Sequence, residues 1–187
     1  MSLKSVLAYP FACFVKLRND RWIKNPLKFQ KKTFHKLIEK AKKTTFGIDH
    51  GFENIKTYED WKKNVPIRDY EGLKEYVDLV VDGKKDVLWP GKPQYFCKTS
   101  GTTSGTKYIP LTKEALPFHI KAARDAILSF IYETKKTAVV NGKMIFLQGS
   151  PELENINGVL TGRLSGITAH HIPCLLYTSP SPRDSCA

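Results

Sequence analysis

The chain has few cysteines, and they are poorly placed for a disulfide framework or a metal site. Four occur in 187 residues, and two of them, Cys174 and Cys186, lie close to the C-terminus. The other two, Cys13 and Cys97, are far apart, and neither belongs to a Cys-x-x-Cys pair or a Cys/His cluster. This pattern excludes a structural zinc signature and favours a reducing compartment over a secreted disulfide scaffold. We expect Cys97 to be a buried packing residue and not a nucleophile.

The sequence also lacks a long apolar run. Residues 6–15 are largely apolar and follow Lys4, as in a signal peptide, but Pro10 interrupts them and the charged segment 16–22 follows directly. The stretch is too short to span a bilayer and has no convincing small-residue cleavage site. We therefore predict a packing helix here, no transmembrane segment and a cytoplasmic protein.

Acidic residues are scarce relative to basic ones. Lys and Arg total 30 against 18 Asp and Glu, which gives a formal net charge of +12. Such a balance is compatible with a nucleic-acid or anionic-membrane partner. The lysines are scattered along predicted helices, however, and no recognised nucleic-acid-binding signature accompanies them. We favour solvated helix faces, expect no specific nucleic-acid partner, and keep a non-catalytic basic binding module as an alternative.

Hydrophobic spacing predicts an α/β protein without internal repeats. With 41% hydrophobic residues, the chain has enough apolar side chains for a core. The predicted helices cover residues 26–43, 58–63, 70–77 and a stretch that Thr112 caps, and the predicted strands cover residues 94–98, 107–111 and 143–148. Residues 44–47 are expected to end the first of these helices. The order strand, helix, strand indicates an α/β sheet.

A run of Gly, Ser and Thr over residues 99–107, which ends in Lys107, carries the main functional signal. Gly101 and Gly105 permit positive φ, so that backbone N–H groups can converge on an anion while the hydroxyls add further donors. The run is not a Walker loop, because three residues separate its glycines and Tyr108 follows the Lys. Taken alone, it is as typical of a hairpin connection as of a phosphate site.

Four segments in order make the interpretation more specific: DHGFENI at 49–55, NVPIRDYE at 64–71, LWPGKP at 88–93, and the loop TSGTTSGTK itself. They resemble the auxin-responsive acyl acid-amido synthetase family, particularly its bacterial members, within the adenylate-forming (firefly luciferase-like) superfamily. The resemblance runs from near Met1 to about Pro173. The fold it implies is the N-terminal part of the large α/β domain of an adenylate-forming enzyme, which would be incomplete here.

The resemblance implies an ATP-dependent ligase that transfers an acyl group in two steps. A carboxylate attacks the α-phosphorus of ATP to give an acyl-adenylate and pyrophosphate, and an amine, such as that of an amino acid, then captures the carbonyl. ATP and Mg²⁺ are the implied cofactors, and a small-molecule carboxylic acid and an amine acceptor are the implied partners. No protein partner is inferred. An acyl-CoA ligase or fatty acyl-AMP ligase of the same superfamily is the nearest alternative.

Carried over by position, the loop becomes the cofactor-binding site. Its hydroxyl residues would contact the ATP phosphates, its glycines would permit the approach of the backbone, and Lys107 would supply charge. The predicted cofactor-binding residues are Thr99, Ser100, Gly101, Thr102, Thr103, Ser104, Gly105 and Lys107. No catalytic residue and no metal ligand is assigned.

Several residues outside the loop are candidates of lower rank. Within residues 1–173, the adjacent His170 and His171 have no carboxylate or cysteine at a diagnostic spacing, so a structural or substrate-lining role is favoured over a metal site. Gly149 and Ser150 are expected near the active cleft. The segment 158–166 resembles a family loop near the acyl side, where Arg163 either steers an anionic substrate or lies on the surface.

The C-terminal residues have a different character. Residues 174–184 look like a translated transposase-type sequencing adapter, with a natural disordered tail as the alternative. We interpret residues 1–173 as an N-terminal fragment of the adenylate-forming domain, with its phosphate loop at 99–107, and residues 174–187 as adapter-derived and disordered. Because family members are much longer, we expect this chain alone to bind ATP weakly and not to complete the reaction.

Overall fold

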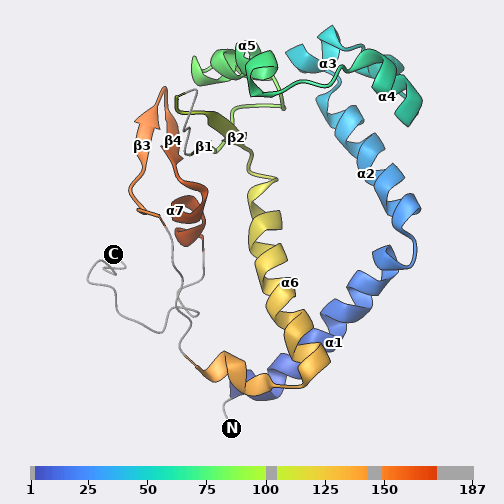
Figure 1. Cartoon of the computed structure of the whole chain (residues 1–187), viewed down its shortest axis with the longest axis vertical. Coiled ribbons are helices and arrows are strands. Elements are labelled where there is room, and N and C mark those ends of the chain that lie inside the picture. The colour runs from blue at the N-terminus through green and yellow to red at the C-terminus, as the bar shows by residue number, and fades with distance from the viewer. Residues whose placement is uncertain (1–2, 100–104, 143–148, 172–187) are drawn as a thin grey trace.

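The computed structural model describes residues 3–99, 105–142 and 149–171. Its elements are α1 (Leu3–Ile23), α2 (Pro26–Ala41), α3 (Thr45–Asp49), η1 (Phe52–Asn54), α4 (Tyr58–Asn64), α5 (Tyr70–Val81), β1 (Tyr95–Lys98), β2 (Tyr108–Leu111), α6 (Leu116–Thr134), η2 (Thr137–Asn141), β3 (Glu154–Ile156), β4 (Val159–Gly162) and α7 (Leu164–Ala169). In Figure 1, α2 rises from α1 to the short helices α3 to α5, and α6 returns from the sheet to α1. The chain thus forms an open ring of helices closed by a small sheet.

Helix α1 packs against α6 through small side chains. Its buried residues, spaced by three or four, are Ser5, Ala8, Ala12 and Val15. Ala8, Ala12 and Val15 meet Leu128 and Ile131 of α6, and Arg18 pairs with Asp125 farther along the same two helices. The prediction of a packing helix is confirmed, although the helix continues through the charged segment to Ile23. In the described parts of the chain, no helix is both long enough and apolar enough to cross a membrane.

Helix α2 ends where its sequence predicts, but the residues that follow do more than terminate it. Thr44 accepts a hydrogen bond from the N–H of Gly47 at 3.1 Å and so begins a second helix, α3. A Cβ atom on Gly47 would lie 2.1 Å from the carbonyl oxygen of Ala41, so only glycine permits this tight junction. The prediction that the helix ends at these residues is confirmed, and residues 44–47 also begin α3.

Side-chain caps start both of the next α-helices. At α4, Thr57 accepts from the N–H of Asp60 at 3.2 Å, and the Asp60 carboxylate accepts from the N–H of Thr57 at 2.8 Å, which is a capping box. At α5, Asp69 accepts from the N–H of Gly72 at 2.8 Å. Both predicted helices are confirmed, and α5 continues beyond its predicted end to Val81.

The four strands in the described residues form one mixed sheet in the order β2-β1-β4-β3. Strand β1 pairs antiparallel with β2 and parallel with β4, and β3 pairs antiparallel with β4. The predicted strands at 94–98 and 107–111 are confirmed as β1 and β2. The predicted strand at 143–148 lies outside the described residues. The mixture of helices and strands confirms the α/β class.

Helices cover both faces of β1. Phe96 is fully buried on the face toward α5, where it packs with Val80 and Val159. Its neighbours Tyr95 and Cys97 point to the other face, toward the start of α6 and toward α7. This alternation is the two-residue period of a strand that is buried on both sides. Cys97 is thus a packing residue, as its sequence context predicts.

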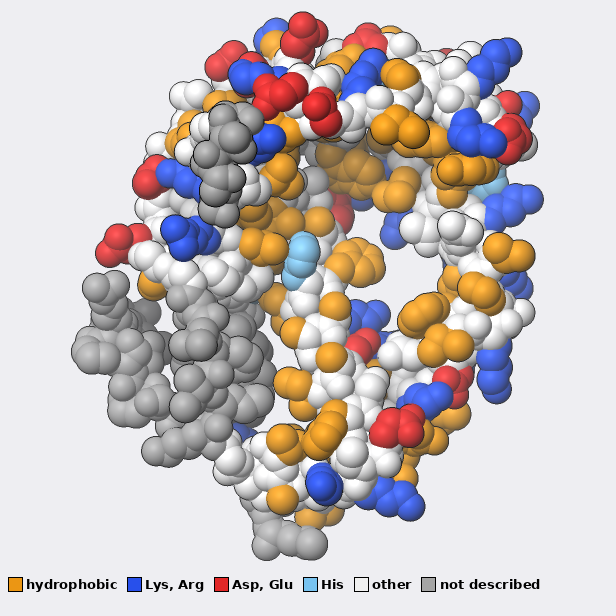
Figure 2. All heavy atoms as spheres, viewed as in Figure 1, with side chains coloured by type: hydrophobic (Ala, Val, Ile, Leu, Met, Phe, Trp, Pro, Cys, Tyr) orange, Lys and Arg blue, Asp and Glu red, His pale blue; other side chains and the backbone are white. Residues whose placement is uncertain are grey.

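Helix α6 differs in detail from its prediction. Thr112 accepts from the N–H of Ala115 at 3.1 Å, one turn before the helix begins, so the prediction that it caps α6 is wrong. Leu116 and Ile131 are buried at the two ends of α6, whereas Ala123 in the middle is exposed. The helix is therefore packed at its ends, on the sheet and on α1. Figure 2 shows the opening that remains between the middle of α6 and α2.

Candidate functional site

The loop of residues 99–107 connects the two strands of an antiparallel hairpin. Lys98 of β1 lies opposite Tyr108 of β2, and the N–H of Thr99 donates to the carbonyl oxygen of Lys107 at 3.2 Å. The two ends of the loop are therefore tied together at its base. The prediction that the loop joins two strands is confirmed.

Three of the eight predicted cofactor-binding residues are described by the structure. Thr99 and Gly105 are exposed, and the side chain of Lys107 is partly exposed. The other five lie outside the described residues, namely Ser100, Gly101, Thr102, Thr103 and Ser104. Gly105 has φ +79°, with open space where a Cβ would be. The positive φ expected for this glycine is confirmed, and backbone geometry favours glycine here, not crowding.

Lys107 lies beside the first turn of α5. Its Nζ is 3.9 Å from the Glu71 carboxylate and 5.0 Å from the ring centre of Tyr70. An exposed ion pair at this distance contributes little. The ammonium group is therefore oriented at the exit of the loop but not neutralised in a buried pair, so it can still meet an anion.

Two of the family-like segments, 49–55 and 64–71, meet through a buried histidine. Arg68 donates to Nε2 of His50 at 2.8 Å, and Nδ1 of His50 lies 2.8 Å from the carbonyl oxygen of Phe46. Because arginine only donates, Nε2 must accept, and the proton belongs on Nδ1, which donates to Phe46. This histidine therefore links the residues before α5 to helix α3.

The segment 88–93 belongs to the same packing unit. Just before it, the carbonyl groups of Asp86 and Val87 accept from the N–H groups of Thr45 and Phe46 at 2.8 and 2.9 Å. Trp89 packs on the cluster that joins α2, η1 and α4. We call residues 45–93, which contain α3, η1, α4 and α5, the helical scaffold. The first three family-like segments lie in it, and α5 brings it against the hairpin that carries the fourth.

The carboxyl ends of β1 and β4 lie at the same end of the sheet. These strands are parallel, with Cys97 opposite Gly162, so the loop that leaves β1 and the residues that follow β4 emerge side by side. Arg163, the first of those residues, is exposed. The segment 158–166 was expected to be a loop. It instead contains strand β4 and the start of α7. Sequence reasoning missed this neighbourhood because strand order is not visible in a sequence.

Gly149 and Ser150 pack against the start of α7. The N–H of Gly149 donates to Oγ of Ser165 at 3.0 Å, and a Cβ on Gly149 would lie 2.7 Å from Cδ of Arg163. Both residues thus lie beside the residues that leave β4. Their role in an active cleft stays a prediction.

The adjacent histidines have separate partners. Nε2 of His171 lies 2.9 Å from the hydroxyl of Tyr95, and Nε2 of His170 lies 2.8 Å from the carbonyl oxygen of Pro151. Each therefore ties the end of α7 to a neighbouring segment. Among residues 3–99, 105–142 and 149–171, no group of three or more His, Cys, Asp or Glu side chains is arranged to hold a metal ion.

A match to a protein-family model assigns the chain that carries this hairpin and scaffold to a family. The model of the GH3 family N-terminal domain matches residues 18–185. The chain belongs to the GH3 family. The family resemblance of the four segments is thereby confirmed. The GH3 match runs into residues 174–185, which lie outside the described residues, and their adapter origin stays a prediction.

Individual GH3 relatives agree with this assignment. Jasmonoyl–L-amino acid synthetase JAR6 of Nicotiana attenuata is 25% identical over 138 residues, which are 72% of this chain and 23% of that protein. Indole-3-acetic acid-amido synthetase GH3.15 of Arabidopsis thaliana is 30% identical over 104 residues, which are 46% of this chain and 18% of that protein. The chain thus spans about a quarter or less of these relatives.

A solved GH3 structure shows the same fold. The GH3.15 acyl acid amido synthetase superposes with a TM-score of 0.75 and 22% sequence identity, covering 90% of this chain and 30% of that one. The expected α/β fold, which corresponds to the N-terminal part of that larger structure, is confirmed.

Proposed function

We propose that the protein to which this sequence belongs activates a carboxylic acid with ATP and transfers the acyl group to an amine. Membership of the GH3 family supports this proposal, as do the names of its relatives, which are acid-amido or acid–amino acid synthetases. The observation that carries it is the placement of the Gly/Ser/Thr loop on a closed hairpin, with Lys107 at its exit. Within this proposal, residues 1–173 are the N-terminal part of the adenylate-forming domain.

The reaction must bring two anions together. A carboxylate oxygen attacks the α-phosphorus, the bond to the bridging oxygen of pyrophosphate breaks, and the acyl-adenylate forms. An amine then attacks the activated carbonyl, AMP leaves with the bonding electrons, and the nitrogen loses a proton. Donors aimed at the phosphates stabilise the charge that develops on pyrophosphate in the first step.

The described part of the loop fits a phosphate ligand by the chemistry of its donors. Exposed Thr99 offers a hydroxyl, Gly105 adopts a conformation that lets successive N–H groups converge, and Lys107 contributes a positive charge. Mg²⁺ would bind mainly phosphate oxygens and water, which is its usual mode with nucleotides, and no described residue is assigned to it.

The names of the relatives favour an amine acceptor over a thiol. Both are named for joining an acid to an amino group, as jasmonoyl–L-amino acid and indole-3-acetic acid-amido synthetases. An acyl-CoA or fatty acyl-AMP ligase shares only the adenylation step. Assaying amide formation with amino acids, against thioester formation with coenzyme A, distinguishes these alternatives.

Replacing Thr102 and Thr103 together by Val tests the phosphate role. In the full-length protein that carries this sequence, we expect carboxylate-dependent exchange of pyrophosphate into ATP to fall at least about 100-fold, because two donors to the phosphates are lost. Thr33→Val, an exposed threonine on α2, is the matched control and should leave the exchange unchanged. Undiminished exchange in the double variant would refute the phosphate role of the loop.

A further inference from the structure

Among the described strands, β2 lies at the edge of the sheet, and its outward backbone groups need partners. In an antiparallel ladder, the bond from the N–H of Thr99 to the oxygen of Lys107 makes Lys98 and Tyr108 a non-hydrogen-bonded pair. The N–H and C=O of Tyr108 therefore point away from β1. At such an edge, unpaired groups invite pairing with other chains or leave the strand end loosely held.

The hydroxyl of Tyr70 takes the place of a neighbouring strand at this point. It accepts from the N–H of Tyr108 at 2.9 Å and lies 3.5 Å from the carbonyl oxygen of the same residue. The next outward-facing position on β2 is Pro110, which has no N–H to satisfy. The outward N–H at the exit of the loop is thus held by one side chain of α5.

The same turn of α5 also holds Lys107. The ring of Tyr70 lies under Nζ of Lys107 at 5.0 Å, and Glu71 adds its carboxylate at 3.9 Å. The first turn of α5 is fixed by the Asp69 cap. The last turn of the same helix is held by packing of Val80 on Phe96. A rigid helix therefore sets both the backbone and the charged side chain at the end of the loop.

We infer that Tyr70 is a positioning residue that fixes the exit of the loop 99–107, and so aims Lys107 at the ATP phosphates. This inference rests on the proposed function for its catalytic consequence. Its hydroxyl orients the backbone at Tyr108, and its ring supports the lysine. Phosphate donors stabilise the transition state only when they are held in place before it forms. Loosening the loop exit therefore has a larger effect on the rate of adenylation than on the stability of the fold.

Tyr70→Phe isolates the hydroxyl, since the ring and its contact with Lys107 remain. The matched control is Tyr76→Phe, because Tyr76 lies on the same helix, is also partly buried, and donates to Asp49 at 2.8 Å without touching the loop. In the full-length protein, we expect Tyr70→Phe to lower kcat/KM for ATP in pyrophosphate exchange about tenfold, with the KM for the carboxylate unchanged. Tyr76→Phe should stay within about twofold of wild type in both.

Amide exchange in the 187-residue chain gives a readout that needs no activity. The Tyr108 N–H should exchange at least about tenfold faster in Tyr70→Phe than in wild type or Tyr76→Phe, because its hydrogen-bond acceptor is gone. Equal amide exchange at Tyr108 in Tyr70→Phe and Tyr76→Phe overturns the inference. Equal kcat/KM for ATP of these two variants in an active enzyme overturns it as well. Wild-type protein without pyrophosphate exchange refutes the proposed function instead, and the Tyr108 amide then decides whether Tyr70 holds the loop exit.

Discussion

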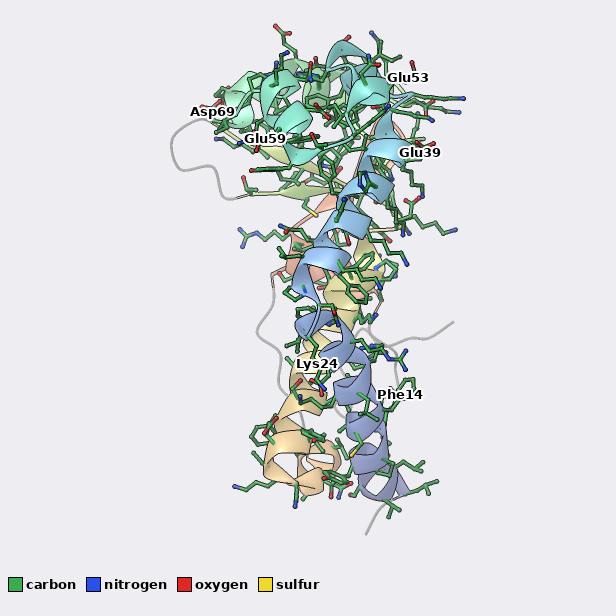
Figure 3. All side chains as sticks on the ribbon, turned by 90° about the vertical axis from the view of Figure 1, so that its right-hand side faces the viewer. Phe14, Lys24, Glu39, Glu53, Glu59 and Asp69 are labelled. Atoms are coloured by element: carbon green, nitrogen blue, oxygen red, sulfur yellow. The ribbon has the colours of Figure 1, made fainter. Side chains whose placement is uncertain are left out.

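The sheet with its helical scaffold and the three long helices α1, α2 and α6 differ in how their apolar side chains are packed. In the first region, Phe96 is fully buried between strands and helix, and side chains cap the short helices. In the second, long helices touch mainly where α1 meets α6, and large apolar side chains remain exposed. Phe14 lies on the outer side of α1 (Figure 3), and Phe118 of α6 is 66% exposed.

The difference shows where stability comes from in this chain. Helix propensity alone sustains a long helix only weakly, and burial of its apolar face does most of the stabilising. In the scaffold, α5 buries such a face through Val77 and Val80, whereas much of α2 and the middle of α6 do not. The region that carries the candidate phosphate loop is therefore the better packed of the two.

The largest test of this comparison replaces one phenylalanine in each region. We expect Phe96→Ala to lower the free energy of unfolding of the chain by about 3–5 kcal/mol, because it removes a fully buried side chain and leaves a cavity. Phe118→Ala, on the exposed face of α6, should change it by no more than about 0.5 kcal/mol. Urea denaturation measures both. Equal losses would mean that the face of α6 is buried in solution.

The two regions also differ in the environment of their cysteines. Burial raises the pKa of the Cys97 thiol on β1, so it holds less reactive thiolate at neutral pH, whereas Cys13 on α1 is only partly buried. We expect iodoacetamide to modify Cys97 at least about tenfold more slowly than Cys13, as followed by peptide mass spectrometry. The two rates should become equal in urea. Equal rates of modification in the native chain would indicate that the sheet around Cys97 opens as readily as the packing of α1 around Cys13.

The smallest expected effect concerns the capping box of α4. Hydrogen bonds from the Thr57 side chain and from the N–H groups of Lys56 and Thr57 lower the pKa of the Asp60 carboxyl. A pKa that is lower in the folded state stabilises the fold above the unfolded value, near 3.9, and this stabilisation is lost as the pH falls through the folded pKa. Asp60→Asn should therefore destabilise the chain at pH 7 and progressively less as the pH drops below about 4.

Two variants provide the controls for this measurement. Thr57→Ala removes the uncharged half of the box and should cost about 1 kcal/mol. Glu59→Gln, on the same helix, changes an exposed carboxylate that pairs only with Lys62 among the contacts shown by the structure. A difference between wild type and Asp60→Asn that stays constant from pH 7 to about pH 2 would contradict the proposed role of the carboxylate.

Local chemistry predicted most of the elements, and its failures share a cause. The strands at 94–98 and 107–111 were predictable from their β-forming residues, and the loop between them from its Gly, Ser and Thr. Thr112 was misjudged as a helix cap, and residues 44–47 were predicted to end one helix but not to begin the next, because turn residues serve equally for both. The role of Tyr70 had no local signal, since its partner lies 38 residues away.

By itself, the sequence determined the Gly/Ser/Thr run between two strands, the family and the approximate course of the helices, because these depend on residue types at short spacing. Only the tertiary structure decided that β1 runs beside β4, that Arg163 emerges next to the loop, and that Tyr70 closes the edge of β2. Strand order and edge pairing arise from contacts between residues distant in sequence. Such contacts are set by which apolar faces can be buried together, and no local pattern encodes them.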